Sequence, residues 1–166
     1  MSEIIGGVDN DPEDTQRGKY LTFSVGNEAY GIEINHVTEI IGIQEITEVP
    51  GMPDYVKGII NLRGKIIPVI EVRLRFKKEA IEYNDRTCII VIDLKDLSIG
   101  LIIDSVSEVI KISEEHIVPP PDTKTGFHNN YVKGIGKVGN EVKLLLDCDL
   151  LVSDDKFENN FDVLED

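Results

Sequence analysis

An internal repeat is the feature that most restricts how this chain can fold. Residues 55–59 read Tyr-Val-Lys-Gly-Ile, and the same five residues return at 131–135, 76 positions later. Residues 31–41 resemble residues 100–110, 69 positions later, and the two blocks keep the same order. The offset changes within a loop that contains three consecutive prolines, where an insertion is tolerated. The repeat therefore predicts two similar halves with one architecture.

Strands rather than helices are expected in both halves. Isoleucine (24) and valine (16) are abundant among the 166 residues, whereas alanine occurs twice. β-Branched side chains pack well on sheets and lose rotamer freedom in helices, which excludes a helical bundle or coiled coil. The pattern predicts a mainly β fold of two small antiparallel barrels, because closing a sheet removes its exposed edges. Units of about 65 residues are marginal alone, so we expect a shared hydrophobic interface with a groove between them.

Alternating apolar residues and turn signals predict the element boundaries. In the first half we expect a hairpin, a short turn, a proline-containing loop and a second hairpin, at 21–34, 35–39, 50–54 and 56–72. In the second half we expect a hairpin, an extended segment, a loop, a hairpin and a short terminal helix, at 87–103, 106–112, 119–130, 131–146 and 147–152. Both halves thus run in the order hairpin, turn and strand, proline loop, hairpin.

The net charge of −14 is concentrated at the two ends of the chain. Residues 1–18 carry five acidic and one basic residue and residues 153–166 carry six acidic and one basic, so together they hold −9. We interpret both segments as disordered acidic tails that aid solubility. The folded region is then 19–152, with a first barrel over about 19–78 and a second over about 86–152, between which strands can be exchanged.

Composition excludes several classes of protein. The acidic charge disfavours a general nucleic-acid binder, which needs a basic face to displace phosphate counterions. No apolar run approaches the ~20 residues that span a bilayer, and the first residues do not resemble a secretory signal. Cys88 and Cys148 form no CxxC motif and suit two buried thiols in a reducing cytosol better than a disulfide. We therefore expect a cytoplasmic protein without direct membrane insertion.

Motifs for catalysis or metal binding are absent from the sequence. There is no HExxH, no GxSxG and no phosphate-binding glycine loop. The three histidines, His36, His116 and His128, are scattered and none lies beside a cysteine. We therefore predict no catalytic residue, no cofactor and no metal ion.

One long run carries a family resemblance. Residues 58–73 read GIINLRGKIIPVIEVR, which resembles the signature of the CheW family of bacterial chemotaxis coupling proteins. Residues 36–41 and 100–109 are similar to further segments of that family, and the resemblance covers about 18–152. It implies two intertwined five-stranded barrels with short helical turns and a short C-terminal helix. The module also occurs in CheA and CheV, but the chain shows no ATP-binding, histidine-transfer or receiver segment, so we expect a stand-alone coupling protein.

The resemblance implies a non-catalytic adaptor that links the cytoplasmic tips of methyl-accepting chemoreceptors to the regulatory domain of the histidine kinase CheA. Such a protein works at receptor arrays on the inner face of the membrane, has no nucleic-acid partner and is monomeric alone. Three residues match family positions tied to kinase contact: Val37, Glu39 and Gly58. Three match positions tied to receptor contact: Arg63, Gly100 and Val109.

These positions also have structural interpretations. Gly58 lies in a strand pattern, where glycine marks a bulge or the close approach of another backbone. Arg63 at a hairpin tip can recognise a partner, pair with Glu39 or remain an ordinary surface cation. Val37 and Val109 fit a core better than a contact on the sequence alone.

Two alternative functions of the chain, and one alternative role for a short basic segment, remain open. The chain can be a coupling module of a non-chemotactic chemosensory pathway. It can also be a metal-dependent enzyme on a double barrel, which would require convergent titratable groups in one cleft. The basic stretch 73–78 is interpreted as a linker between the halves rather than as a surface for acidic receptor helices.

Overall fold

A computed structural model of the chain describes residues 16–121 and 131–153. Most of the two predicted acidic tails, at 1–15 and 154–166, and the segment 122–130 with His128 lie outside the described residues. The predicted mainly β fold with few short helices is confirmed.

Most elements follow the expected order, but residues 37–39 of the predicted short turn belong to a strand, and the helix at 72–75 and the strand at 117–118 were not predicted. The strands of the first half are β1 (Lys19–Val25), β2 (Glu28–Glu33), β3 (Val37–Gly42), β4 (Val56–Leu62) and β5 (Lys65–Glu71). Those of the second half are β6 (Cys88–Leu94), β7 (Leu97–Ile103), β8 (Ser105–Lys111), β9 (Ile117–Val118), β10 (Val132–Val138) and β11 (Glu141–Leu146). The helical elements are the 3-10 turns η1 (Ile34–His36) and η2 (Glu114–His116) and the helices α2 (Val72–Arg75) and α3 (Cys148–Val152).

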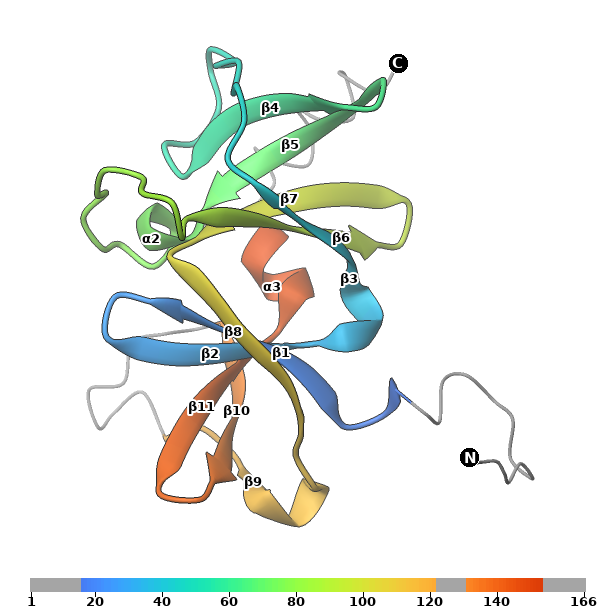
Figure 1. Ribbon diagram of the computed structural model, residues 1–166, viewed down its shortest axis with the longest axis vertical. Coiled ribbons are helices and arrows are strands. Elements are labelled where there is room, and N and C mark those ends of the chain that lie inside the picture. Colours follow the sequence, from blue (N-terminus) through green and yellow to red (C-terminus); the bar gives the residue numbers. More distant parts are fainter. Residues whose placement is uncertain (1–15, 122–130, 154–166) are drawn as a thin grey trace.

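Two sheets are formed, and each takes strands from both halves of the repeat (Figure 1). The six-stranded sheet has the order β8-β1-β2-β11-β10-β9, and the five-stranded sheet has the order β3-β6-β7-β5-β4. The leading hairpin of each half, β1–β2 or β6–β7, therefore lies in the sheet that the other half builds. The exchange is symmetric, because β3 pairs with β6 as β8 pairs with β1.

Strand pairing differs from the all-antiparallel prediction at two places. β5 pairs with β7 in parallel, and β11 pairs with β2 in parallel. Each of these pairs joins the last strand of one half to the exchanged hairpin of the other half. No tight turn links the two strands, so the chain connection does not force them to run antiparallel.

The largest apolar cluster draws on both sheets. It includes Phe23 and Tyr30 from the six-stranded sheet and Ile92 and Leu101 from the five-stranded sheet, and α3 contributes Leu151. Figure 1 shows α3 between the two sheets. Two smaller clusters belong mainly to one sheet each. Two units that are each marginal alone thus share one hydrophobic core, as the size of each half predicts.

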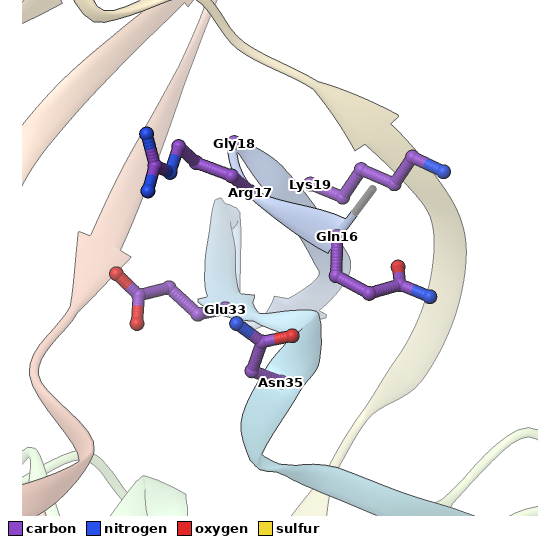
Figure 2. Close-up of a pocket in the computed structure, with 6 residues that line it drawn as sticks. All are labelled: Gln16, Arg17, Gly18, Lys19, Glu33 and Asn35. Atoms are coloured by element: carbon purple, nitrogen blue, oxygen red, sulfur yellow. The ribbon is translucent and has the colours of Figure 1, made fainter. Parts of the chain in front are cut away.

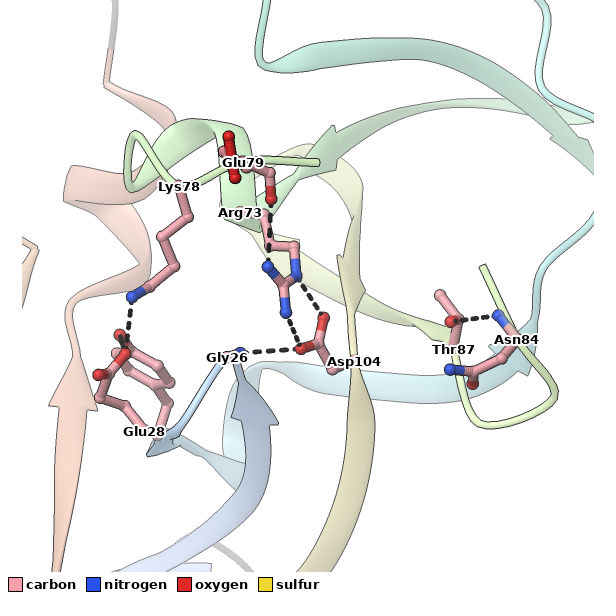
Figure 3. Close-up of polar contacts among 9 residues, drawn as sticks. Gly26, Glu28, Arg73, Lys78, Glu79, Asn84, Thr87 and Asp104 are labelled. Carbon is pink, nitrogen blue, oxygen red and sulfur yellow. Dashed lines mark hydrogen bonds and ion pairs between the residues drawn. The ribbon is translucent and has the colours of Figure 1, made fainter. Parts of the chain in front are cut away.

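Ion pairs connect the linker between the halves, residues 73–78, to residues of the neighbouring strands and turns. Arg73 donates from Nε and Nη2 to the two carboxylate oxygens of Asp104, at 2.9 and 2.7 Å. The same carboxylate accepts the Gly26 N–H at 2.8 Å, and Lys78 pairs with Glu28 at 2.7 Å (Figure 3). These contacts favour the linker interpretation of the basic stretch.

Asp104→Asn is expected to lower the free energy of unfolding by about 2 kcal/mol at neutral pH, because a mostly buried ion pair loses one charge. Burial alone raises the pKa of Asp104, but the hydrogen bonds from Arg73 and Gly26 outweigh it and hold the pKa below its usual value. A carboxylate with a lowered folded-state pKa stabilises the protein above about pH 4, and this contribution is lost as the pH falls through the folded-state pKa. Urea unfolding at pH 7 and pH 3 measures the effect; an equal loss at both pH values would contradict it.

Candidate functional site

The predicted contact residues form two sets that the fold distributes differently. The kinase set (Val37, Glu39 and Gly58) lies on β3 and β4 of the five-stranded sheet. In the receptor set (Arg63, Gly100 and Val109), Arg63 occupies the β4–β5 turn, Gly100 lies on β7 and Val109 lies on β8 of the six-stranded sheet. The kinase set is therefore confined to one sheet, whereas the receptor set spans both.

An ion pair brings the two sets together. Arg63 Nη2 donates to Glu39 Oε2, across the gap between the β4–β5 turn and β3. The side chain of Arg63 is 68% exposed and that of Glu39 is 32% exposed, so the pair itself adds only ~0–1 kcal/mol to stability. Its stabilising effect is small, and both charged groups remain accessible to a partner.

A polar groove surrounds this ion pair. Its volume is about 330 Å³, and it is lined by Thr38, Glu39, Leu62, Arg63, Lys65, Ile67, Val91, Asp93 and Ser98. Lys65 Nζ donates to Ser98 Oγ at 2.8 Å, and Ser98 Oγ donates to Asp93 Oδ1 at 2.5 Å. Asp93 and Ser98 face each other in the β6–β7 register, which the expected hairpin at 87–103 could have revealed. The approach of Lys65 depends on the order of strands in the sheet, and the sequence pattern gives no signal for it.

Gly58 marks the point where the chain that leaves β3 crosses β4. Thr47 N donates to Ile59 O at 2.9 Å, and Ile59 N donates to Thr47 O at 2.8 Å. Gly58 has a φ of 151°, and a Cβ there would lie 2.2 Å from the Thr47 carbonyl oxygen. The register of β4 shifts between Val56 and Gly58. The close approach of two backbones therefore requires glycine, in agreement with its structural interpretation.

Gly100 and Val37 also have packing roles. Gly100 is buried on β7, and a Cβ there would lie 2.7 Å from Ile89 Cγ2 and 2.7 Å from Val69 Cγ1. Val37 is half-buried and packs against the large apolar cluster between the sheets. Both residues therefore contribute to packing within the fold.

Exposed apolar side chains recur at equivalent positions of the repeat. Val109 on β8 is 50% exposed, and Ile40, 69 positions earlier on β3, is 44% exposed. Ile66 on β5 is 52% exposed, and Val142, 76 positions later on β11, is 55% exposed. The sequence favoured a core position for Val109, and its exposure shows that this prediction is wrong. The other three residues were not predicted as exposed, although the repeat relates each of them to a partner.

A second polar pocket lies at the start of β1 (Figure 2). Its volume is about 250 Å³, and it is lined by Gln16, Arg17, Gly18, Lys19, Glu33 and Asn35. Glu33 pairs with Lys133 at 2.8 Å and with His36 at 3.5 Å. This second pocket contains none of the predicted contact residues, so the groove at Glu39 and Arg63 is the stronger candidate for the binding site.

Metal ligands and cysteine thiols can be placed in the part of the chain that the structure describes. Within it, no group of three or more His, Cys, Asp or Glu side chains is placed to hold a metal ion. The two cysteines are free thiols, and burial raises the pKa of Cys148 to about 12. Over the same residues, no helix has both the length and the apolar character needed to cross a membrane.

Comparisons with known proteins agree on one family. A scan of protein families matches residues 19–156 to the CheW-like domain. The chemotaxis protein CheW of Klebsiella aerogenes is 35% identical over 138 residues, which cover 83% of this chain and 83% of that protein. CheW of Treponema pallidum is 36% identical over 137 residues, covering 80% of this chain and 81% of that protein. The crystal structure of the scaffolding protein TtCheW from Thermoanaerobacter tengcongensis aligns with a TM-score of 0.77 at 36% identity, over 84% of this chain and 94% of that one.

Proposed function

The chain belongs to the CheW family of chemotaxis scaffolding proteins, and from this we propose that it couples the cytoplasmic tips of methyl-accepting chemoreceptors to the regulatory domain of the histidine kinase CheA. As a scaffold in chemotaxis signalling it is non-catalytic, which replaces the alternative of a metal-dependent enzyme. Its site of action in this proposal is the cytoplasm, at receptor arrays on the inner face of the membrane.

The ion pair between Glu39 and Arg63 is the observation that carries the proposal. It joins one residue of the kinase set to one residue of the receptor set. A partner that binds either residue must compete for, or reorient, the charge of the other. Binding of the kinase and binding of the receptor can therefore influence each other within a single groove.

We divide the six residues by their exposure into contacts and supports. Glu39, Arg63 and Val109 present accessible side chains and are proposed as direct contacts. The other three act through the packing described above and are proposed as supports of that surface: Val37, Gly58 and Gly100.

Arg63→Glu is expected to reduce receptor-dependent activation of the kinase by about tenfold, the effect of losing ~1.4 kcal/mol of interaction. The melting temperature should stay close to that of the unmodified protein, because an exposed ion pair contributes little to stability. A reconstituted mixture of receptor, CheA and this protein measures the activation, and pull-down with isolated receptor tips measures binding. Unchanged activation and unchanged binding would contradict the proposed role.

Two further variants show whether Arg63 acts directly. Arg86→Glu makes the same charge change at an exposed residue outside both sets, and it should leave activation unaltered. The double variant Glu39→Arg/Arg63→Glu restores the ion pair but reverses both charges that a partner meets. Receptor-dependent kinase activation should remain reduced in this double variant. Full recovery of activation would mean that the ion pair only stabilises the fold and that neither residue contacts a partner.

A further inference from the structure

The helices α2 and α3 occupy equivalent positions in the two halves. The Glu71 N–H, just before α2, donates to the Tyr55 carbonyl at 2.8 Å. The Asp147 N–H, just before α3, donates to the Tyr131 carbonyl at the same distance of 2.8 Å. Tyr55 and Tyr131 are the first residues of the five-residue identity, 76 positions apart. An approximate two-fold relation therefore extends from the strands to these helices.

Arg75, at the end of α2, contacts both of the equivalent tyrosines. Its Cζ lies 4.2 Å from the ring centroid of Tyr55 and 4.7 Å from that of Tyr131. Its Nε donates to the Leu151 carbonyl at 2.7 Å, and Leu151 is the residue 76 positions after Arg75. A residue that touches both members of an equivalent pair, and its own counterpart as well, must lie near the two-fold axis.

The repeat is broken at this point for a physical reason. A second arginine at position 151 would bring two guanidinium groups to one axis, where like charges repel each other. Leu151 instead is fully buried, with 0% exposure, in the cluster between the sheets. A single cation between two aromatic faces is favourable, and it gains when it is partly removed from water. One arginine therefore serves both halves.

We propose that Arg75 is a positioning residue that fixes the orientation of the two sheets relative to each other. Tyr55 leads directly into β4 of the five-stranded sheet, and Tyr131 leads into β10 of the six-stranded sheet. We call Arg75 together with Tyr55 and Tyr131 the junction. Phe76 stacks on Tyr131 with ring centroids 5.6 Å apart and extends this junction. Arg75 thus ties together the entry points of one strand in each sheet.

This junction sets the geometry of the receptor set, an inference that rests on the proposed function. Arg63 belongs to the five-stranded sheet and Val109 to the six-stranded sheet. A receptor that contacts both residues needs the two sheets held in one orientation, whereas the kinase set lies on a single sheet. Loosening the junction should therefore impair coupling to the receptor while leaving binding of the kinase regulatory domain intact.

The orientation is tested without any partner. Spin labels at Asn27→Cys and Asp96→Cys, introduced with Cys88→Ser and Cys148→Ala, report the distance between the exposed turns of the two exchanged hairpins. Double electron–electron resonance should give a clearly broader distance distribution for Arg75→Ala than for the parent. Arg86→Ala, at an exposed arginine, is the matched control and should not broaden it. An unchanged distribution for Arg75→Ala would overturn the proposal.

Hydrogen exchange on the protein with its natural cysteines gives a second readout. Faster exchange of amides in α3 and β10 in Arg75→Ala, with β6 and β7 unchanged, supports a loosened junction. Uniformly faster exchange would instead indicate general destabilisation and would overturn the positioning role.

The functional arm separates the two proposals. Arg75→Ala should bind the CheA regulatory domain as the unmodified protein does, yet lose receptor-dependent kinase activation by about fivefold. Full activation in a variant with a broadened distance distribution would overturn the link to coupling. Failure of the unmodified protein to bind the regulatory domain would overturn the proposed function, and the distance measurement would still decide the role of Arg75.

Discussion

Gly58→Ala is expected to lower the free energy of unfolding by about 3 kcal/mol or more, the largest loss of any single substitution considered. The new Cβ would lie 2.2 Å from the Thr47 carbonyl oxygen and 2.8 Å from the Thr47 carbonyl carbon. These are backbone atoms held by two hydrogen bonds to Ile59, so they cannot rotate away as a side chain would. The φ of 151° adds strain for any residue with a side chain.

Two other glycines provide graded controls for this prediction. Gly134 is the repeat equivalent, and a Cβ there would meet Ile117 Cγ2 at 2.9 Å, a side-chain rather than a backbone atom, on a half-buried residue. A Cβ at Gly42 on β3 would have nothing within 4 Å, so Gly42→Ala should be close to neutral. Urea unfolding followed by circular dichroism ranks the three variants. If Gly58→Ala lost kinase binding while keeping its stability, Gly58 would be a direct contact rather than a support.

Gly100→Ala is expected to lower the free energy of unfolding by about 2 kcal/mol and to weaken receptor coupling in parallel. Its Cβ would lie 2.7 Å from methyl groups of both Ile89 and Val69, which are fully buried with 0% exposure. β-Branched side chains have few alternative rotamers, so the strain must pass into the backbone of β7. β7 lies between β6 and β5 in the five-stranded sheet.

A compensating substitution distinguishes support from contact at Gly100. Val69→Ala alone leaves a cavity, but combined with Gly100→Ala it makes room for the added methyl group. The double variant should be more stable than the sum of the single effects predicts, and receptor coupling should recover with stability. Recovered stability without recovered coupling would contradict the support role. Gly31→Ala, which meets the longer side chain of Leu145 at 3.1 Å, should cost less than Gly100→Ala.

Local pattern predicts most of the elements because each depends on neighbours in the chain. The hairpin at Arg63 and Gly64 follows from two apolar runs flanking a turn, and Asp147 caps the start of α3 by accepting the Leu150 N–H with its side chain. The exposed pair of Glu39 and Arg63 is also predictable, since a hairpin tip allows a long cation to reach a carboxylate. The exposure of Val109 is not, because an edge strand leaves apolar residues uncovered that alternation alone assigns to a core.

The sequence by itself determined the two-fold repeat, the β content and the family, because these reside in composition, spacing and a long ordered motif. The family resemblance already implied intertwined halves, but only the tertiary structure decided which hairpins change places and that two strand pairs are parallel. Pairing between the halves leaves no mark on either strand. The tertiary structure also decided that Gly100 is buried and that Arg75 lies between Tyr55 and Tyr131. Burial and stacking depend on which residues, distant in the sequence, come into contact. These contacts form only when the two sheets pack around their common core.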